Sequence, residues 1–231
     1  MKYAFLFTVI ISLSGFIPDD KEHITHLLYH RNDYQMLYSE KYEQPVYVKY
    51  TINKEDVHGS FKRKNNFKAD KEIKQASASL SDYRKSGYDR GHLKPAAVSK
   101  GTKLDMDQSF LMSNMSPQLP EFNRQGWKGI ESEVRSLLKT QDSIIVYTGP
   151  VLHGIDQFIG NNKVGVPKYY YKAILLGDSS KAYAYLVPHE KIAKPYDKYI
   201  VSIDSLEVLI ECDLYKGLNE KMETSNNDKI N

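Results

Sequence analysis

The short segment Asp89-Arg90-Gly91-His92 places a carboxylate, a guanidinium and an imidazole side by side. A guanidinium can bind a phosphate, and histidine is the natural proton acceptor near neutral pH. Gly91 is expected to give this segment backbone flexibility. The four residues therefore suggest acid–base chemistry on a phosphate ester, although an ordinary turn with a surface histidine has the same sequence signature.

A second group of polar residues lies in FLMSNMSPQLPEFNRQGWKGIESEVR, residues 110–135. It contains the amides Asn114 and Asn123, followed by Glu131 and Arg135, which are one helical turn apart. An amide oxygen is a hard, neutral ligand that suits Mg²⁺. Together with the upstream histidine, these groups favour a metal-assisted phosphodiesterase. Taken singly, Asn123 is also compatible with a helix N-cap, and Glu131 with Arg135 with a surface ion pair.

The elements that must position these residues are visible in the hydrophobic pattern. Apolar residues recur at helical spacing from about Phe122 to Thr140, and Glu131 and Arg135 flank that stripe. Both side chains are therefore expected to point into a cleft at the edge of a helix. The basic segment 61–74 and the turn-rich segment 80–116 show no long period and are expected as loops.

Strand patterns surround this helix. In 45–52, Val46, Val48, Tyr50 and Ile52 share one face, which is typical of a half-buried strand. The C-terminal half adds strands expected over 143–152, 168–176 and 182–188. The stretch 200–210 is expected to begin as a strand and to continue as a helix capped by Ser202 or Asp204.

The two polar segments resemble the signatures of the DNA/RNA non-specific endonucleases, a family that includes secreted bacterial nucleases and endonuclease G. SDYRKSGYDRGHLKPAA is similar to the family's segment around its catalytic histidine, and FLMSNMSPQLPEFNRQGWKGIESEVR to its second signature. YSEKYEQPVYVKY, TGPVL, VPKYYYKAILL and IVSIDSLE resemble its strands and closing element. The ending ECDLYKGL departs from the family's apolar ending, which leaves the C-terminal packing open.

The resemblance implies an α+β fold of the ββα-metal (His-Me finger) type, with a central antiparallel sheet and flanking helices. It implies that His92 is the general base, which deprotonates the attacking water. It further implies that Asn123 is the direct ligand of a hydrated Mg²⁺ ion, for which Mn²⁺ is an alternative, and that Glu131 holds a metal-bound water.

The same resemblance assigns supporting roles to five more residues. Arg90 and Arg135 correspond to groups near the phosphate and the metal, and Arg63 to a further arginine that stabilises the transition state. Asp89 and Asn114 are expected to be structural or to lie outside the direct metal ligands.

Composition limits these expectations without deciding them. The 231 residues, 41% of them hydrophobic, suffice for one domain, and a net charge of +3 permits nucleic-acid binding but does not argue for it. The 18 tyrosines suit half-buried strands or a polar cleft. The single cysteine, Cys212, excludes an internal disulfide and a cysteine-based zinc site, and is expected to be a small core residue.

The N-terminus predicts export. Lys2 and the apolar run YAFLFTVIISLSGF match a signal peptide over 1–17, so a secreted or periplasmic protein without membrane contact after signal removal is expected. A buried strand or a retained anchor remains an alternative. Residues 18–40 are expected as a flexible lead-in with a short helix carrying His23, His26 and His30, then a nuclease domain over 41–220 and a polar tail over 221–231.

The resulting hypothesis is a secreted metal-dependent endonuclease. It would hydrolyse DNA and RNA with little sequence specificity and leave 5′-phosphate and 3′-hydroxyl ends. The alternatives are an exported toxin that needs an inhibitor partner, a relative that binds nucleic acid without cutting, and a hydrolase of another phosphodiester. A homodimer and an inhibitor protein stay open as partners beside DNA and RNA.

Overall fold

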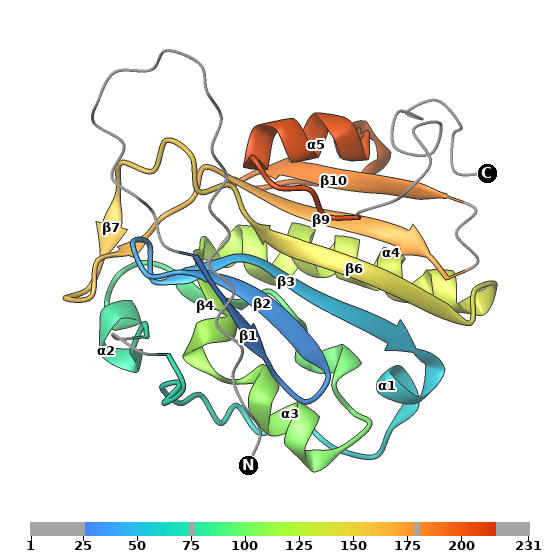
Figure 1. Cartoon of the computed structure of the whole chain (residues 1–231), viewed down its shortest axis with the longest axis horizontal. Coiled ribbons are helices and arrows are strands. Elements are labelled where there is room, and N and C mark those ends of the chain that lie inside the picture. The colour runs from blue at the N-terminus through green and yellow to red at the C-terminus, as the bar shows by residue number, and fades with distance from the viewer. Residues whose placement is uncertain (1–25, 74–76, 178–180, 216–231) are drawn as a thin grey trace.

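A seven-stranded sheet runs through the centre of the computed structural model, which describes residues 26–73, 77–177 and 181–215 (Figure 1). Its strand order is β1-β2-β3-β6-β9-β10-β11, and every neighbouring pair is antiparallel. The strands are β1 His26–His30, β2 Tyr34–Ser39, β3 Gln44–Asn53, β6 Ser143–Pro150, β9 Tyr169–Leu176, β10 Ala182–Pro188 and β11 Ile200–Val201.

The hydrophobic pattern located most of these strands. In β3 the face with Val46 and Val48 is buried, whereas Thr51 on the opposite face is exposed. The strands expected over 143–152, 168–176 and 182–188 are confirmed as β6, β9 and β10. After β11 the chain enters helix α5, Ile203–Ile210, and Ser202 is its cap because its side chain accepts a hydrogen bond from the Ser205 N–H.

The expected lead-in over 18–40 is corrected from residue 26 onwards. The segment forms β1 and β2, which pair with each other and join the sheet through β3, so the domain includes residues before 41. His26 and His30 lie on one exposed strand face, not on a helix, and His23 is outside the described residues. Tyr34, Met36 and Tyr38 alternate along β2 and are buried, which is the pattern of a strand. The sequence interpretation gave more weight to the helical spacing of the histidines and missed this alternation.

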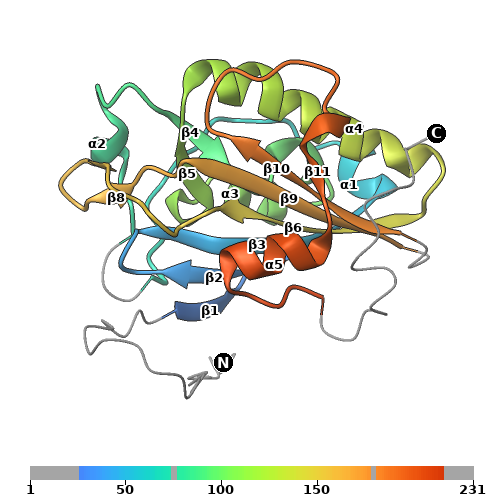
Figure 2. The same ribbon diagram turned by 90° about the horizontal axis from the view of Figure 1, so that it is seen from above.

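Helices cover the sheet on both faces (Figure 2). On one face, Val146 and Ile174 pack against Trp127 and Ile130 of the long helix that includes α4, Lys128–Ser136. On the other face, α5 packs on the sheet through Ile203 and Leu206. Tyrosines fill much of both clusters, including Tyr50, Tyr170, Tyr171, Tyr183, Tyr185 and Tyr215.

Short elements complete the fold, and some of them line a cavity. Two ribbons are formed by β4 Asp89–His92 with β5 Met115–Gln118, and by β7 Phe158–Ile159 with β8 Val164–Gly165. The short helices are α1 Lys54–His58, α2 Leu80–Tyr83, α3 Lys103–Ser109, η1 Ala96–Val98, η2 Met112–Asn114, η4 Leu137–Lys139 and η5 Asp197–Tyr199. A π-helical turn, η3 Phe122–Trp127, leads directly into α4.

A buried ion pair fixes the long loop between α1 and α2. Arg31, at the turn between β1 and β2, pairs with Asp70, and Asp70 also accepts a hydrogen bond from Ser113. Both charged side chains are almost fully buried, so removing either one would leave the other with weaker compensation, from the exposed Glu72 for Arg31 and from Ser113 for Asp70. This pair therefore anchors the loop that carries Arg63 and Phe67.

The C-terminal part of the described chain is packed despite its unusual sequence. Leu214 and Tyr215 are buried in the cluster under α5, and the Tyr215 hydroxyl donates to the Ile145 carbonyl at 3.3 Å. Cys212 is half-buried at the edge of that cluster and not inside it as expected. The expected signal peptide and the tail over 221–231 lie outside the described residues. Among the described helices, none has the length and apolarity to cross a bilayer.

Candidate active site

The ribbon of β4 and β5 presents the Asp89–His92 segment. Its antiparallel register sets Gly91 opposite Ser116 and His92 opposite Met115. A Cβ at Gly91 would lie 2.2 Å from the side chain of the buried Gln118. Close packing against Gln118 therefore requires a glycine at position 91. The sequence had suggested backbone flexibility as the reason for this glycine, which the structure does not support.

Asn114 fixes the chain immediately after the histidine. Its Oδ1 accepts from the Lys94 N–H at 2.9 Å, and its Nδ2 donates to the Lys94 carbonyl at 2.9 Å and the Ser109 carbonyl at 2.8 Å. The side chain is completely buried and its hydrogen-bonding groups are satisfied. The structure therefore places Asn114 in the scaffold behind His92, where it faces no substrate.

His92 packs against two aromatic rings at the cavity wall, which also contact each other. The ring centroids of Phe67 and Phe110 are 5.5 Å and 5.0 Å from its imidazole, and its buried Nε2 has no hydrogen-bond partner among the described residues. Burial, reinforced by the charges of Arg63 and Arg90, lowers the pKa of His92 to about 3. The imidazole is therefore neutral at pH 7 and can accept a proton.

The long helix begins as soon as β5 ends, and this brings Asn123 beside the ribbon. Helical backbone starts at Pro120, a position where proline is well tolerated, and His189 accepts the Leu119 N–H at 2.7 Å. Asn123 lies inside the helix, because its own N–H binds the Leu119 carbonyl at 2.9 Å. It is therefore not the N-cap, which excludes the alternative interpretation of this residue.

The side chain of Asn123 is oriented by Asp89. Asn123 Nδ2 donates to Asp89 Oδ2 at 3.0 Å, and Arg124 donates to the two Asp89 oxygens at 2.8 Å and 2.6 Å. Burial alone would raise the pKa of Asp89, but these hydrogen bonds and the arginine charge outweigh it and lower the pKa. Asn123 Oδ1 receives no hydrogen bond from the described residues, so it is available to a ligand.

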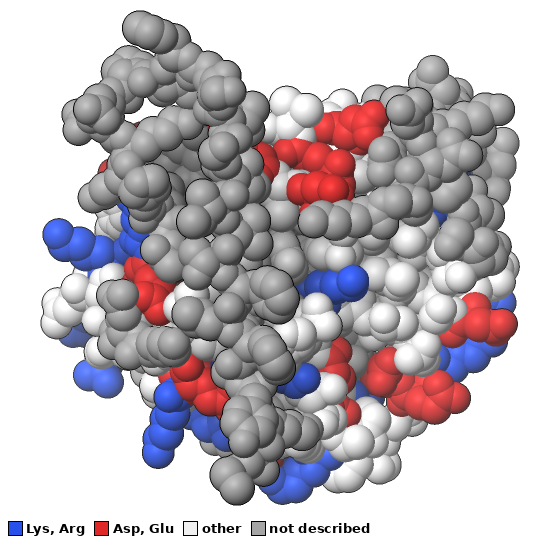
Figure 3. All heavy atoms as spheres, in the orientation of Figure 1, with Lys and Arg blue, Asp and Glu red and all other residues white. Residues whose placement is uncertain are grey.

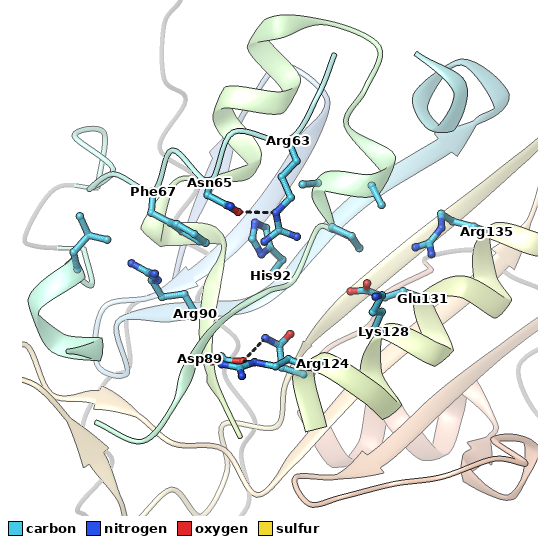
Figure 4. A pocket seen from close by; sticks show the side chains of 15 residues that line it. Arg63, Asn65, Phe67, Asp89, Arg90, His92, Arg124, Lys128, Glu131 and Arg135 are labelled. Carbon is cyan, nitrogen blue, oxygen red and sulfur yellow. Dashed lines mark hydrogen bonds and ion pairs between the residues drawn. The ribbon is translucent and has the colours of Figure 1, made fainter. Parts of the chain in front are cut away.

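One face of the helix supplies charged side chains to the cavity (Figure 4). Arg124, Lys128, Glu131 and Arg135 follow each other at intervals of four, three and four residues, which places them on one face. Arg135 donates to Ser132 at 2.7 Å, and no ion pair joins it to Glu131 in the described structure. The surface ion pair considered from sequence is therefore not formed, and both residues point into the cavity as expected.

The cavity has a volume of about 800 Å³ and is positively charged. Opposite the helix, Arg63 donates to Asn65 at 2.7 Å, and the Arg90 guanidinium lies 4.1 Å from the centre of the Phe67 ring. Five cationic side chains face it against two carboxylates: Arg63, Arg90, Arg124, Lys128 and Arg135 against Asp89 and Glu131. On the surface seen in Figure 3, charges of both signs are interspersed.

A buried lysine from the sheet lies below the helix face. Lys172 Nζ donates to Thr148 Oγ1 at 3.1 Å and to Tyr50 at 3.3 Å, and lies 4.8 Å from the Trp127 ring centre. Burial lowers the pKa of Lys172 to about 8, opposed by the charge of Glu131. Burial also raises the pKa of Glu131, and Lys172 is the first of the cations that oppose this shift.

The oxygen atoms in the cavity fit a hydrated divalent metal. Asn123 Oδ1 is a free amide oxygen and Glu131 supplies a carboxylate on the same wall. Within the described residues, no group of three or more His, Cys, Asp or Glu side chains could enclose a metal. An ion held here would keep most of its water ligands, which is the behaviour that Mg²⁺ prefers.

The structure therefore brings seven of the eight residues selected from sequence to one cavity, and places Asn114 behind it. Sequence reasoning missed Arg124, Lys128 and Lys172. The helical spacing from Glu131 and Arg135 back to Lys128 and Arg124 would have revealed the first two. Lys172 was signalled only by a single charge within the apolar run of β9.

A ββ ribbon followed by a helix, with a histidine on the ribbon and an amide on the helix, defines a ββα-metal nuclease domain. A family model for DNA/RNA non-specific endonucleases matches residues 20–221, and the chain belongs to this family. The expected α+β fold is confirmed by a solved structure titled as an EndoG/EndoGI complex and the mechanism of EndoG inhibition. It is 30% identical with a TM-score of 0.80, over 88% of this chain and 92% of that chain.

Curated relatives agree with the family. Human mitochondrial endonuclease G is 30% identical over 194 residues, which cover 77% of this chain and 65% of that protein. A nuclease from Nostoc sp. is 29% identical over 87% of this chain and 77% of its own length. The chain thus spans slightly less than two thirds of the endonuclease G protein that it matches.

Acidification should destabilise the protein through His92. Histidine in the unfolded chain takes up a proton near pH 6.5, whereas the pKa of folded His92 is about 3. Between these values the unfolded state binds one proton more, so the free energy of unfolding falls as the pH decreases. In urea unfolding between about pH 7 and 4, the wild type should lose up to about 1.4 kcal/mol per pH unit more than His92→Ala.

The exposed His153 provides the matched control, because His153→Ala also removes one imidazole. This variant should keep the wild-type pH dependence. A His92→Ala variant with the same pH dependence as the wild type would contradict the buried, neutral state of His92.

Proposed function

We propose that this protein is a metal-dependent endonuclease that hydrolyses the phosphodiester bonds of DNA and RNA with little sequence preference. The observation that carries the proposal is the convergence of a neutral imidazole, a free amide oxygen and a carboxylate on one positively charged cavity. Membership of the DNA/RNA non-specific endonuclease family supports the same reaction.

His92 would act as the general base. Its neutral imidazole takes a proton from a water molecule, and the water oxygen attacks phosphorus while the bond to the 3′-oxygen breaks. Arg63 and Arg90 depress the pKa of His92 in the free protein. A bound phosphodiester offsets those two charges, so the pKa of His92 should rise when substrate binds, which makes the imidazole a stronger base at that moment.

The remaining side chains would stabilise the charge that develops on the phosphate. Arg63, Arg90 and Arg135 face the cavity and can neutralise the non-bridging oxygens. Asp89 holds the Asn123 amide with its oxygen toward the ligand, and Glu131 can accept a hydrogen bond from a metal-bound water. A Mg²⁺ ion, or Mn²⁺ in its place, would supply charge stabilisation on the phosphate and on the leaving 3′-oxygen.

This chemistry predicts the substrate range and the products. Attack by water does not need a ribose 2′-hydroxyl, so both DNA and RNA qualify, and the products carry 5′-phosphate and 3′-hydroxyl ends. Contacts to phosphates position a substrate without reading its bases, so low sequence specificity follows. Because a solved relative is titled as a complex with EndoGI and as explaining EndoG inhibition, an inhibitor protein is also proposed as a partner of this chain.

Plasmid nicking tests the proposal directly. With Mg²⁺ the wild type should convert supercoiled DNA to open-circular DNA, and EDTA should abolish this activity. His92→Ala should retain the fold and slow single-turnover cleavage by about 10²–10⁴-fold, the usual effect of losing a general base. His153→Ala should cut like the wild type. A wild type that binds DNA but does not nick it would favour the non-cutting alternative, and a loss below about tenfold in His92→Ala would assign the base elsewhere.

The metal assignment is tested by comparing Asn123→Ala with Glu131→Ala. Asn123→Ala removes the direct ligand, so activity should collapse and added Mg²⁺ should restore little. Glu131→Ala removes a contact through water, so activity should fall by about 10–100-fold and recover partly at high Mg²⁺. Gln125→Ala, an exposed amide on the same helical turn, is the control and should behave like the wild type.

Melting curves with and without Mg²⁺ complete this comparison, because the metal should stabilise the wild type and Gln125→Ala but not Asn123→Ala. An Asn123→Ala protein that is folded and cuts at the wild-type rate would overturn the assignment of the metal ligand.

The N-terminal segment supports a proposed location outside the cytoplasm. The charged start and the short apolar run over 1–17 suit a cleaved signal peptide. Sequencing the N-terminus of protein recovered from the periplasm or medium should give a start beyond this run. Recovery of chains beginning at Met1 only, and only in the cytoplasm, would refute this proposal.

A further inference from the structure

A second hollow continues the cavity beyond Arg90. It has a volume of about 420 Å³ and lies between α2 and the start of β4. Leu80, Asp89 and Arg90 line both spaces, so the two hollows adjoin at these residues. Three residues line the second hollow but not the first cavity: Tyr83, Arg84 and Tyr88. A polymer that extends from the first cavity past Arg90 would therefore enter this hollow.

The hollow has the charge of a phosphate site. Arg84 is exposed, and its guanidinium makes no hydrogen bond or ion pair with the described residues. The carboxylate of Asp89, the single acid in this lining, is already bound by Arg124 and Asn123. The hollow therefore presents the positive charge of Arg84 and Arg90 without a free carboxylate to oppose it.

The same hollow offers surfaces for a nucleobase. The half-buried Tyr88 ring rests against His189, with the ring centroids 6.0 Å apart. Leu80 leaves 41% of its area exposed at the rim, where it adds an apolar surface beside the Tyr88 ring. An aromatic ring beside a free arginine is the combination with which proteins bind single-stranded nucleic acid, through base stacking and phosphate contact.

We propose that this hollow is a subsite for the nucleotide next to the cleaved bond, with Tyr88 stacking on its base and Arg84 binding its phosphate. The inference rests on the proposed nuclease function and extends it, because it assigns binding residues outside the reacting groups. The subsite tolerates any base, since every base has a face that can stack. It requires a strand whose base is unpaired, so single strands should gain more from it than duplexes.

Two variants test the two halves of the subsite. Binding of a short single-stranded DNA is measured in EDTA over a series of salt concentrations. Tyr88→Ala should raise the Kd by about 5- to 100-fold, the range for losing one stacked base, and Tyr88→Phe should retain wild-type binding. Arg84→Gln should reduce the slope of log K against log salt by about 0.7, the value for one phosphate contact on a single strand.

Lys85→Asn is the matched control. It removes a cation adjacent to Arg84 that does not line the hollow, and asparagine tolerates the positive φ of 58° at this position. The control should retain the wild-type Kd and salt slope. The same DNA with abasic sites should bind the wild type more weakly, and this difference should shrink in Tyr88→Ala only.

The test distinguishes failure of the subsite from failure of the nuclease proposal. With Mg²⁺ and saturating DNA, the control Lys85→Asn should keep the wild-type kcat within about twofold, because Lys85 lines neither the hollow nor the first cavity. If the wild type cuts DNA but Arg84→Gln and Tyr88→Ala bind like Lys85→Asn, the subsite is refuted and the nuclease proposal stands. If Tyr88→Ala melts at a lower temperature than the wild type, the salt slope of Arg84→Gln decides between the subsite and its absence, because Arg84 is exposed and its replacement should not affect folding.

Discussion

The site depends on one polar junction, in which Asp89 at the start of β4 binds Asn123 and Arg124 at the start of the long helix. This contact joins the element that carries His92 to the element that carries the amide oxygen. Because Asp89 occupies the amide nitrogen, the oxygen of Asn123 must point the other way, toward the cavity. The first residue of the Asp89–His92 segment thus orients the Asn123 amide, while the last places an imidazole on the same cavity.

A second constraint is electrostatic. The cavity gathers five cationic side chains, and burial together with the charges of two of them, Arg63 and Arg90, penalises a protonated His92. Packed against Phe67 and Phe110, the imidazole therefore stays neutral, a state that can accept a proton but is only weakly basic in the free protein. Under the proposed function, an anionic substrate would offset the charges of Arg63 and Arg90, which would couple substrate binding to the basicity of His92.

The sheet supports this arrangement with buried polar groups. Lys172 brings a cation below Glu131, and the Arg31–Asp70 pair fixes the loop that holds Arg63 and Phe67. Each of these charges is costly to bury and is tolerated because it has hydrogen bonds or a partner. Asn114 and His189 provide hydrogen-bond partners for neutral backbone groups. Asn114 binds the backbone of Lys94 after β4, and His189 binds the Leu119 N–H before the long helix and the Pro167 carbonyl.

The sequence by itself determined the family, the strands β3, β6, β9 and β10, and the residues of the two polar segments. These features are local, because alternation, helical spacing and short motifs depend only on neighbouring residues. The sequence interpretation missed β1 and β2, because the helical spacing of the histidines was weighed above the alternation of Tyr34, Met36 and Tyr38. It also attributed the role of Gly91 to flexibility, whereas close packing against Gln118 requires a glycine there. Only the tertiary structure decided that Asn123 is held by Asp89, that Lys172 lies below Glu131 and that the cavity extends past Arg90 to Tyr88. Those contacts join residues far apart in the chain, and no local pattern of side chains encodes which distant partner a residue will face.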